Sequence, residues 1–113
     1  MQRPTRAISI RQPYVEQILR GTKRFEYRSR RTNIRERVYI YAGLRPGLES
    51  QWKKLKMSPG DLPTGKIVGT VEIADCRQLH SGEYAYRLLN PQRLTRARTP
   101  KNQPQPGFWI PRF

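Results

Sequence analysis

The octapeptide GTKRFEYR, residues 21–28, sets one carboxylate among three basic side chains in a short segment with strand character. In a regular strand successive side chains point to opposite faces, so we predict that Phe25 and Tyr27 enter the core. The opposite face, which carries Glu26 and Arg28, then lines an open surface or a cleft. A cluster of charges placed in this way predicts a functional site.

Lys23 joins this charged cluster only if the chain is still turning after Gly21, because its parity in a strand is wrong. Glycine permits such a turn. Upstream, an apolar stripe predicts a helix over residues 12–20, with Pro13 at the first helical position and Gly21 at the C-terminal cap. The charged segment therefore follows a short helix.

Three polar residues, Ser9, Arg11 and Gln12, lead from a first strand into this helix. Backbone N–H groups at the start of a helix are unpaired and carry partial positive charge, so the segment is a candidate for holding a phosphate. Capping of the helix is the alternative role for these side chains. The sequence leaves both roles open.

The overall charge indicates the class of partner. The 113 residues include 23 Lys and Arg against 8 Asp and Glu, which gives a net charge of +15, and 17 of the basic residues are Arg. The planar guanidinium binds phosphate oxygens in pairs and stacks on bases, so this excess predicts nucleic acid. We expect RNA ahead of DNA as the partner, although charge and composition do not distinguish the two. An acidic protein surface is the alternative partner that charge alone would satisfy.

Long apolar segments and metal-binding residues are scarce. No run approaches the ~20 apolar residues of a membrane-spanning helix, and the N-terminus lacks the apolar core of a secretory signal. We therefore expect a soluble, cytoplasmic protein without membrane contact. Cys76 is the single cysteine and His80 the single histidine, which excludes an internal disulfide and a multi-cysteine zinc site. We expect a monomer with no metal and no cofactor.

The remaining pattern predicts several short strands and a second helix. Many short strands with only two helices in this length predict an α+β fold, a small, partly open β-barrel with flanking helices. Gly69, inside the clearest strand pattern, is expected to mark a bulge or bend. Four prolines predict an extended basic segment over residues 90–106. The predicted strands are 7–10, 24–28, 38–41, 67–74, 84–88 and 108–110, and the predicted second helix is 48–57, with Leu48, Trp52 and Leu55 on its apolar side.

Basic and aromatic side chains elsewhere are candidates for further contacts. The arginine-rich segment 29–37 is predicted to be an exposed basic loop, and a solvated surface turn is the alternative. Tyr14, Tyr41 and Trp109 are candidates for stacking on bases, although each also suits the core. The predicted nucleic-acid-binding residues are Ser9, Arg11, Gln12, Lys23, Glu26, Arg28, Arg30, Arg31, Arg35, Tyr41, Arg96 and Arg98.

Read in order, the segments SIRQP (residues 9–13), Gly-x-Lys-x-x-Glu-x-Arg (21–28) and VYIYA (38–42) resemble the ASCH domain of the PUA-like superfamily. Residues 65–71 and 84–109 resemble the later strands of that family, so the resemblance covers nearly the whole chain, 1–113, as a single domain. It implies a β-barrel with a cleft beside the first helix, into which Lys23, Glu26 and Arg28 project. It also implies binding of RNA or DNA.

Some relatives within this resemblance act as ribonucleases, or as amidohydrolases on acetylated cytidine, so a small hydrolase is the alternative function. The amidohydrolases combine a motif lysine, a threonine and a distant glutamate, and Glu26 stands here at the position expected for the threonine. Lys23 and Glu26 are the candidate catalytic residues if the protein is an enzyme, with Glu83 a further candidate by position. A metal-independent phosphodiesterase would use Lys23 with Tyr41 or Ser9.

Overall fold

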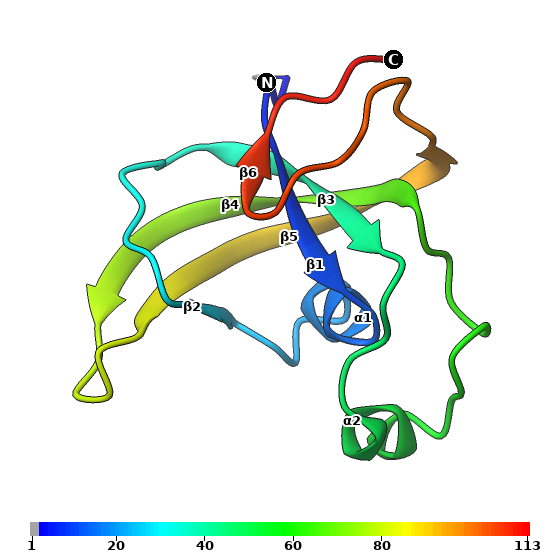
Figure 1. Ribbon diagram of the computed structural model, residues 1–113, viewed down its shortest axis with the longest axis horizontal. Coiled ribbons are helices and arrows are strands. Elements are labelled where there is room, and N and C mark those ends of the chain that lie inside the picture. Colours follow the sequence, from blue (N-terminus) through cyan, green and yellow to red (C-terminus); the bar gives the residue numbers. More distant parts are fainter. Residues whose placement is uncertain (1–2) are drawn as a thin grey trace.

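The computed structural model describes residues 3–113 and consists of one curved sheet with two short helices (Figure 1). The six strands follow the order β2-β5-β4-β3-β1-β6, and β2 and β6 are the two edges, so the barrel is not closed. This confirms the predicted α+β fold with a small, partly open barrel. The elements are β1 (Ala7–Arg11), α1 (Tyr14–Leu19), β2 (Phe25–Arg28), β3 (Arg37–Gly43), α2 (Glu49–Lys54), β4 (Lys66–Gln78), β5 (Tyr84–Arg98) and β6 (Phe108–Trp109).

The two long strands, β4 and β5, curve through the whole molecule and give the sheet its barrel shape (Figure 1). Their pairing shifts register at several points, one of them between Ile67 and Gly69. A Cβ atom at Gly69 would lie 2.6 Å from Leu19 Cδ2 and 2.7 Å from the backbone oxygen of Gln92. Glycine is therefore required where β4 passes closest to α1 and β5, as expected for a bend.

The apolar residues of the sheet and of α1 form the main core. Alternating residues of β1, β3 and β4 face α1, whose Val15 and Ile18 are fully buried. Strand β1 pairs in parallel with β3, and the register sets Arg11 beside Gly43. The carboxyl ends of these two strands, and the loops that follow them, therefore open at the same place beside α1.

Three predicted elements need correction. The first helix starts at Tyr14 rather than at residue 12, since Pro13 is the N-cap, with ψ of 10°. In the second helix Trp52 is buried as predicted, but Leu48 is the N-cap and is 66% exposed. The predicted strand 84–88 is longer than expected, because β5 continues to Arg98 and pairs with β4, so only residues 99–106 of the predicted extended basic segment lie outside the sheet.

The continuation of β5 has a clear physical reason. Pro91 lacks an N–H group and is expected to end a ladder of strand hydrogen bonds. Here Thr70 pairs with Gln92 and Glu72 pairs with Leu89, so Pro91 lies within a bulge where the ladder is interrupted anyway.

Among residues 3–113, no helix is long and apolar enough to cross a membrane.

Candidate functional site

The face of β2 that points toward the core is the charged one, whereas the prediction placed the aromatic face there. Phe25 and Tyr27 are 40% and 50% exposed, whereas Glu26 is only 8% exposed. The assignment of the two aromatic side chains to the core is therefore wrong. Glu26 lies opposite the buried Tyr86 of β5, whose ring packs against Phe108 inside the barrel. The inward face of β2 is charged because basic neighbours compensate Glu26 there.

Two cations hold the Glu26 carboxylate. Lys23 Nζ lies 3.6 Å from Glu26 Oε1, and the Nε and Nη2 atoms of Arg28 lie 2.8 Å and 2.7 Å from Glu26 Oε2. Arg28 Nη2 also donates to the backbone oxygen of Ser9 at 2.6 Å. The guanidinium of Arg28 is therefore fixed in position by two partners on different strands.

Lys23 reaches this group because the chain is still turning when it leaves α1. Gly21 has a φ of +83°, and the N–H groups of Thr22 and Lys23 both donate to the backbone oxygen of Gln17. The ammonium of Lys23 also lies 5.6 Å from the ring centroid of Tyr14 and 5.1 Å from that of Tyr27. These rings flank the lysine and attract its ammonium at the mouth of the site.

A cleft of about 660 Å³ opens beside these charges, between the end of β1, the turn before β2, and the loop that precedes β6. Half of the twelve residues predicted to bind nucleic acid line it. They are Ser9, Arg11, Lys23, Glu26, Arg28 and Tyr41.

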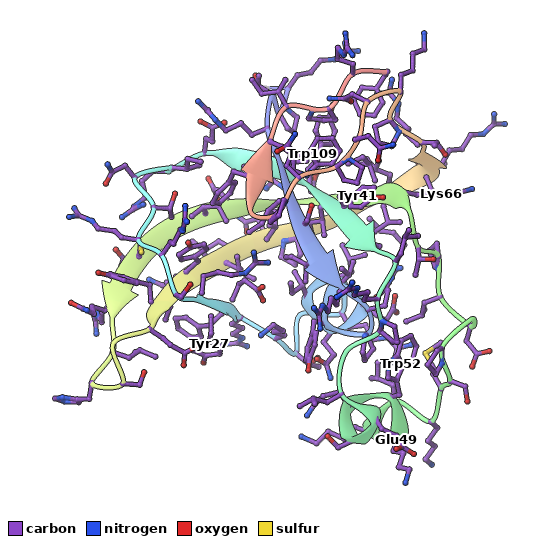
Figure 2. The ribbon with its side chains drawn as sticks, in the orientation of Figure 1. Tyr27, Tyr41, Glu49, Trp52, Lys66 and Trp109 are labelled. Atoms are coloured by element: carbon purple, nitrogen blue, oxygen red, sulfur yellow. The ribbon has the colours of Figure 1, made fainter. Side chains whose placement is uncertain are left out.

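The wall of the cleft formed by β1 and β3 is supported by polar and aromatic contacts with β6 and the loop before it. Ser9 Oγ donates to the backbone oxygen of Gln105 at 2.8 Å and accepts the indole N–H of Trp109 at 2.9 Å. The rings of Tyr41 and Trp109 meet edge to face, 5.4 Å apart, and Figure 2 shows them near one another. Burial raises the pKa of the Tyr41 hydroxyl, so this group stays protonated at neutral pH.

The other predicted residues lie outside the cleft. Gln12 is 1% exposed, and its amide accepts the Glu16 N–H and donates to the Pro63 backbone oxygen, so it supports the start of α1 and cannot touch an outside ligand. Arg30 and Arg31 line an adjacent groove of about 580 Å³ that shares Arg28 with the cleft.

Arg35, Arg96 and Arg98 are exposed but do not line the cleft. The guanidinium of Arg35 donates to backbone oxygens of its own loop, and that of Arg98 stacks 3.6 Å from the ring centroid of Phe113. Glu83 is exposed in the turn between β4 and β5. Within residues 3–113, no three His, Cys, Asp or Glu side chains come together as a candidate metal site.

Sequence reasoning missed the contribution of two loops. Arg45, just after β3, and residues 104–107, just before β6, complete the lining of the cleft. The sequence signal for Arg45 is its position after a strand whose end lies beside Arg11, but that requires the parallel pairing of β1 with β3 to be known. The proline-rich segment 104–107 carries no comparable signal.

A second buried carboxylate was also missed. Glu16 on α1 is 5% exposed and accepts hydrogen bonds from Arg20 at 2.7 Å and from both terminal nitrogens of Arg93 at 2.9 Å and 3.1 Å. Burial alone would raise the pKa of Glu16, but the hydrogen bonds and charges of Arg93 and Arg20 outweigh it and lower the pKa. This network joins α1 to β5, and none of its three residues lines the cleft.

Comparison with known proteins gives two findings. The model of the ASCH domain family matches residues 8–102. Activating signal cointegrator 1 of Mus musculus is 35% identical to this chain over 80 residues, which cover 61% of the chain and 14% of that relative. The chain thus spans much less than two thirds of the length of this relative, and the similarity concerns one region of it.

Proposed function

Since this chain belongs to the ASCH domain family, we propose that it is a nucleic-acid-binding module, that RNA is its preferred ligand, and that the ligand enters the cleft beside α1. The observation that carries this proposal is the fixed guanidinium of Arg28. Its contacts with Glu26 and with the Ser9 backbone oxygen orient the group before any ligand arrives. A guanidinium held in this way loses little conformational entropy when it binds a phosphate or the edge of a base.

The charge of the cleft supports an anionic ligand. Arg11, Lys23, Arg28 and Arg45 contribute four positive charges to its lining, against the single carboxylate of Glu26. A cleft lined by one sign of charge concentrates the field and attracts counter-charged ligands from a distance. Tyr14, Tyr27 and Tyr41 line the same cleft and offer aromatic surface for a base.

The first experiment measures the anisotropy of labelled single-stranded RNA, single-stranded DNA of the same sequence, and duplex DNA across a salt series. We expect binding that weakens steeply with salt, with RNA preferred. Lys23→Ala and Arg28→Ala should weaken binding, while Arg112→Ala, which removes an exposed charge near the C-terminus, should not. Parent-like binding of both cleft variants at matched salt would contradict the proposal.

A small hydrolase remains a second candidate, and the contact between Lys23 and Glu26 favours it. The two groups lie 3.6 Å apart inside the cleft, where one could donate and the other accept a proton. The same experiment tests this, because the length of the RNA can be checked after incubation. RNA that is shortened by the parent protein but stays intact with the Lys23→Ala variant would support a ribonuclease. RNA that stays intact with both proteins would support binding alone.

A further inference from the structure

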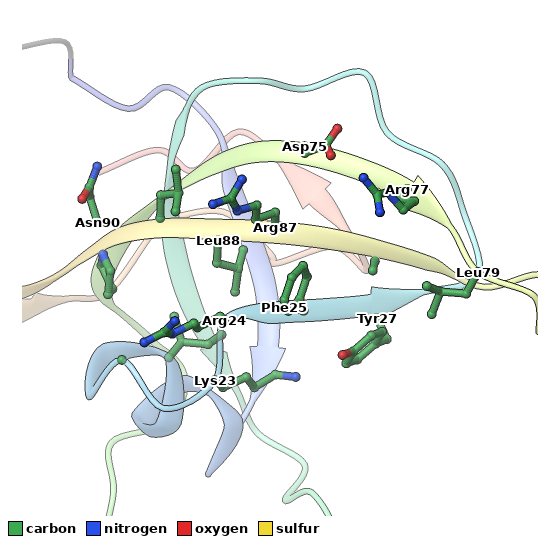
Figure 3. A pocket seen from close by; sticks show the side chains of 15 residues that line it. Lys23, Arg24, Phe25, Tyr27, Asp75, Arg77, Leu79, Arg87, Leu88 and Asn90 are labelled. Carbon is green, nitrogen blue, oxygen red and sulfur yellow. The ribbon is translucent and has the colours of Figure 1, made fainter.

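A second groove lies on the outer face of the sheet, across β2, β5 and β4 (Figure 3). It has a volume of about 790 Å³ and does not belong to the cleft, although Lys23 and Tyr27 line both. We propose that this outer groove binds the nucleotides that flank the one held in the cleft, so that a single RNA strand crosses the edge strand β2 from one site to the other. The inference rests on the proposed function.

The register of the strands builds the groove from two rows of side chains. Phe25, Arg87 and Asp75 form one row across the three strands. Tyr27, Ala85 and Arg77 form the next row on the same face. The small side chain of Ala85 leaves a hollow between Tyr27 and Arg77.

The two aromatic side chains provide a surface for stacking. Phe25 and Tyr27 are exposed on the same face, and their rings, inclined to one another by 27°, have centroids 6.5 Å apart. That spacing is close to the two-residue repeat of a strand, so each ring can receive a separate base. Exposed aromatic side chains on a sheet, surrounded by cations, are typical of surfaces that bind single-stranded nucleic acid without strong sequence preference.

The charge of the groove favours phosphate over an apolar partner. Arg24, Arg77 and Arg87 are exposed, and within residues 3–113 none of them forms an ion pair with a carboxylate. Asp75 is the one acidic residue in the lining. Figure 3 shows the arginines around the two aromatic rings, which matches a ligand with alternating bases and phosphates.

Lys23 and Tyr27 join the two sites. The lysine ammonium lies between the Glu26 carboxylate of the cleft and the ring of Tyr27 at the rim of the outer groove. Strand β2 is the edge of the sheet, and no other strand in residues 3–113 covers the passage from one side to the other. An extended strand of RNA can therefore cross it without displacing any part of the fold.

Oligonucleotide length separates this inference from the proposed function. The probes are a labelled trinucleotide and a labelled 12-nucleotide single-stranded RNA, measured by anisotropy. Phe25→Ala, Arg77→Ala and Arg87→Ala change only the groove, Arg28→Ala changes the cleft, and Arg112→Ala is the control. We expect each groove variant to bind the 12-nucleotide RNA roughly tenfold more weakly and the trinucleotide as the parent does.

The salt dependence adds a second readout. Arg77→Ala and Arg87→Ala should each lower the salt slope by about 0.7 with the long RNA, while Phe25→Ala should leave it unchanged. Groove variants that bind the long RNA like Arg112→Ala, while Arg28→Ala loses it, would overturn the inference and leave the proposed function standing. Loss in the groove variants with parent-like binding by Arg28→Ala would overturn the proposed function of the cleft, and with it the path of one RNA strand from the cleft into the groove. Parent-like RNA binding with loss of self-association would instead assign the groove to a second copy of the chain.

Discussion

The sharpest test of the cleft replaces Arg28 by lysine. Arg28→Lys keeps the positive charge but cannot keep the planar fork that now binds Glu26 through two nitrogens and the Ser9 backbone oxygen through one. If the cleft works only through net charge, this substitution should be nearly silent. If it works through an oriented guanidinium, affinity should fall.

The contacts allow the size of that fall to be worked out. A hydrogen bond to a charged group contributes about 1.5–3 kcal/mol. Because Nε and Nη2 of Arg28 are held by Glu26 and Ser9, its Nη1 group is aimed in a fixed direction and can donate to a phosphate, whereas a lysine ammonium would not be held in that orientation. Loss of one such bond, at the lower end of the range, raises Kd about tenfold. The salt slope should not change, because the number of charges is the same.

The assay is a salt series of RNA anisotropy measurements on the parent, Arg28→Lys, Arg28→Ala and Arg112→Lys. Arg28→Ala should show both a weaker affinity and a slope lower by about 0.7. Arg112→Lys controls for the exchange of an exposed arginine. A Kd for Arg28→Lys within twofold of the parent at every salt concentration would refute the argument from orientation, provided that thermal melting shows the variant to be folded.

Three further predictions concern the scaffold. The folded-state pKa of Glu16 lies below the ordinary value of 4.5, so its stabilisation is present above about that pH and is lost as the pH falls through the lowered pKa. Arg93→Ala should therefore have a lower free energy of unfolding than the parent at pH 7, and that free energy should fall less between pH 7 and pH 3. Urea unfolding measures both, and an equal fall in the two proteins would contradict the assigned network. Gly69→Ala should destabilise the fold by about 1–3 kcal/mol, because the new Cβ meets the backbone. Gly43→Ala, whose Cβ would be 3.7 Å from its nearest neighbour, is the matched control, and equal stability of the two variants would count against this packing. Burial raises the pKa of Tyr41, so the ultraviolet pH titration of the parent should contain a tyrosine component that ionises above pH 10. Tyr41→Phe should lack that component; loss of a tyrosine component that ionises near pH 10 instead would refute the burial.

Much of the architecture was predictable because its signals are local. The apolar runs of β1, β3 and β4 have no competing helical pattern. Gly69 within the β4 pattern indicated the bend, and the structure has no room for a Cβ atom at that position. The extent of β5 was not predictable, because Pro91 normally ends a strand and only the bulge opposite Val71 lets the ladder resume. That bulge depends on a partner strand about twenty residues away.

The candidate site was predictable in membership but not in geometry. Three of the six predicted residues that line the cleft belong to the Gly-x-Lys-x-x-Glu-x-Arg motif, whose spacing places its charges on one side once Gly21 turns the chain. The other three, Ser9, Arg11 and Tyr41, lie on β1 and β3. Arg45 was missed because its position depends on the parallel pairing of β1 with β3, a long-range contact. For Gln12 the sequence left a ligand role and a capping role open, because an amide near a helix start suits both; in the structure the side chain is buried and accepts the Glu16 N–H.

The orientation of β2, with its charged face inward and its aromatic face outward, is the reverse of the prediction and determines which surfaces a ligand can reach. Hydrophobicity alone would bury Phe25 and Tyr27, but the inward position opposite Tyr86 holds a carboxylate neutralised by two cations, and this leaves both aromatic rings outside. Had the rings been inside, the strand would have offered a single charged face. As built, its inward face supplies the fixed charges of the cleft and its outward face supplies stacking surface. A four-residue edge strand therefore divides the two proposed binding surfaces, and their separation by one strand is what makes the length of the RNA the deciding variable in the test.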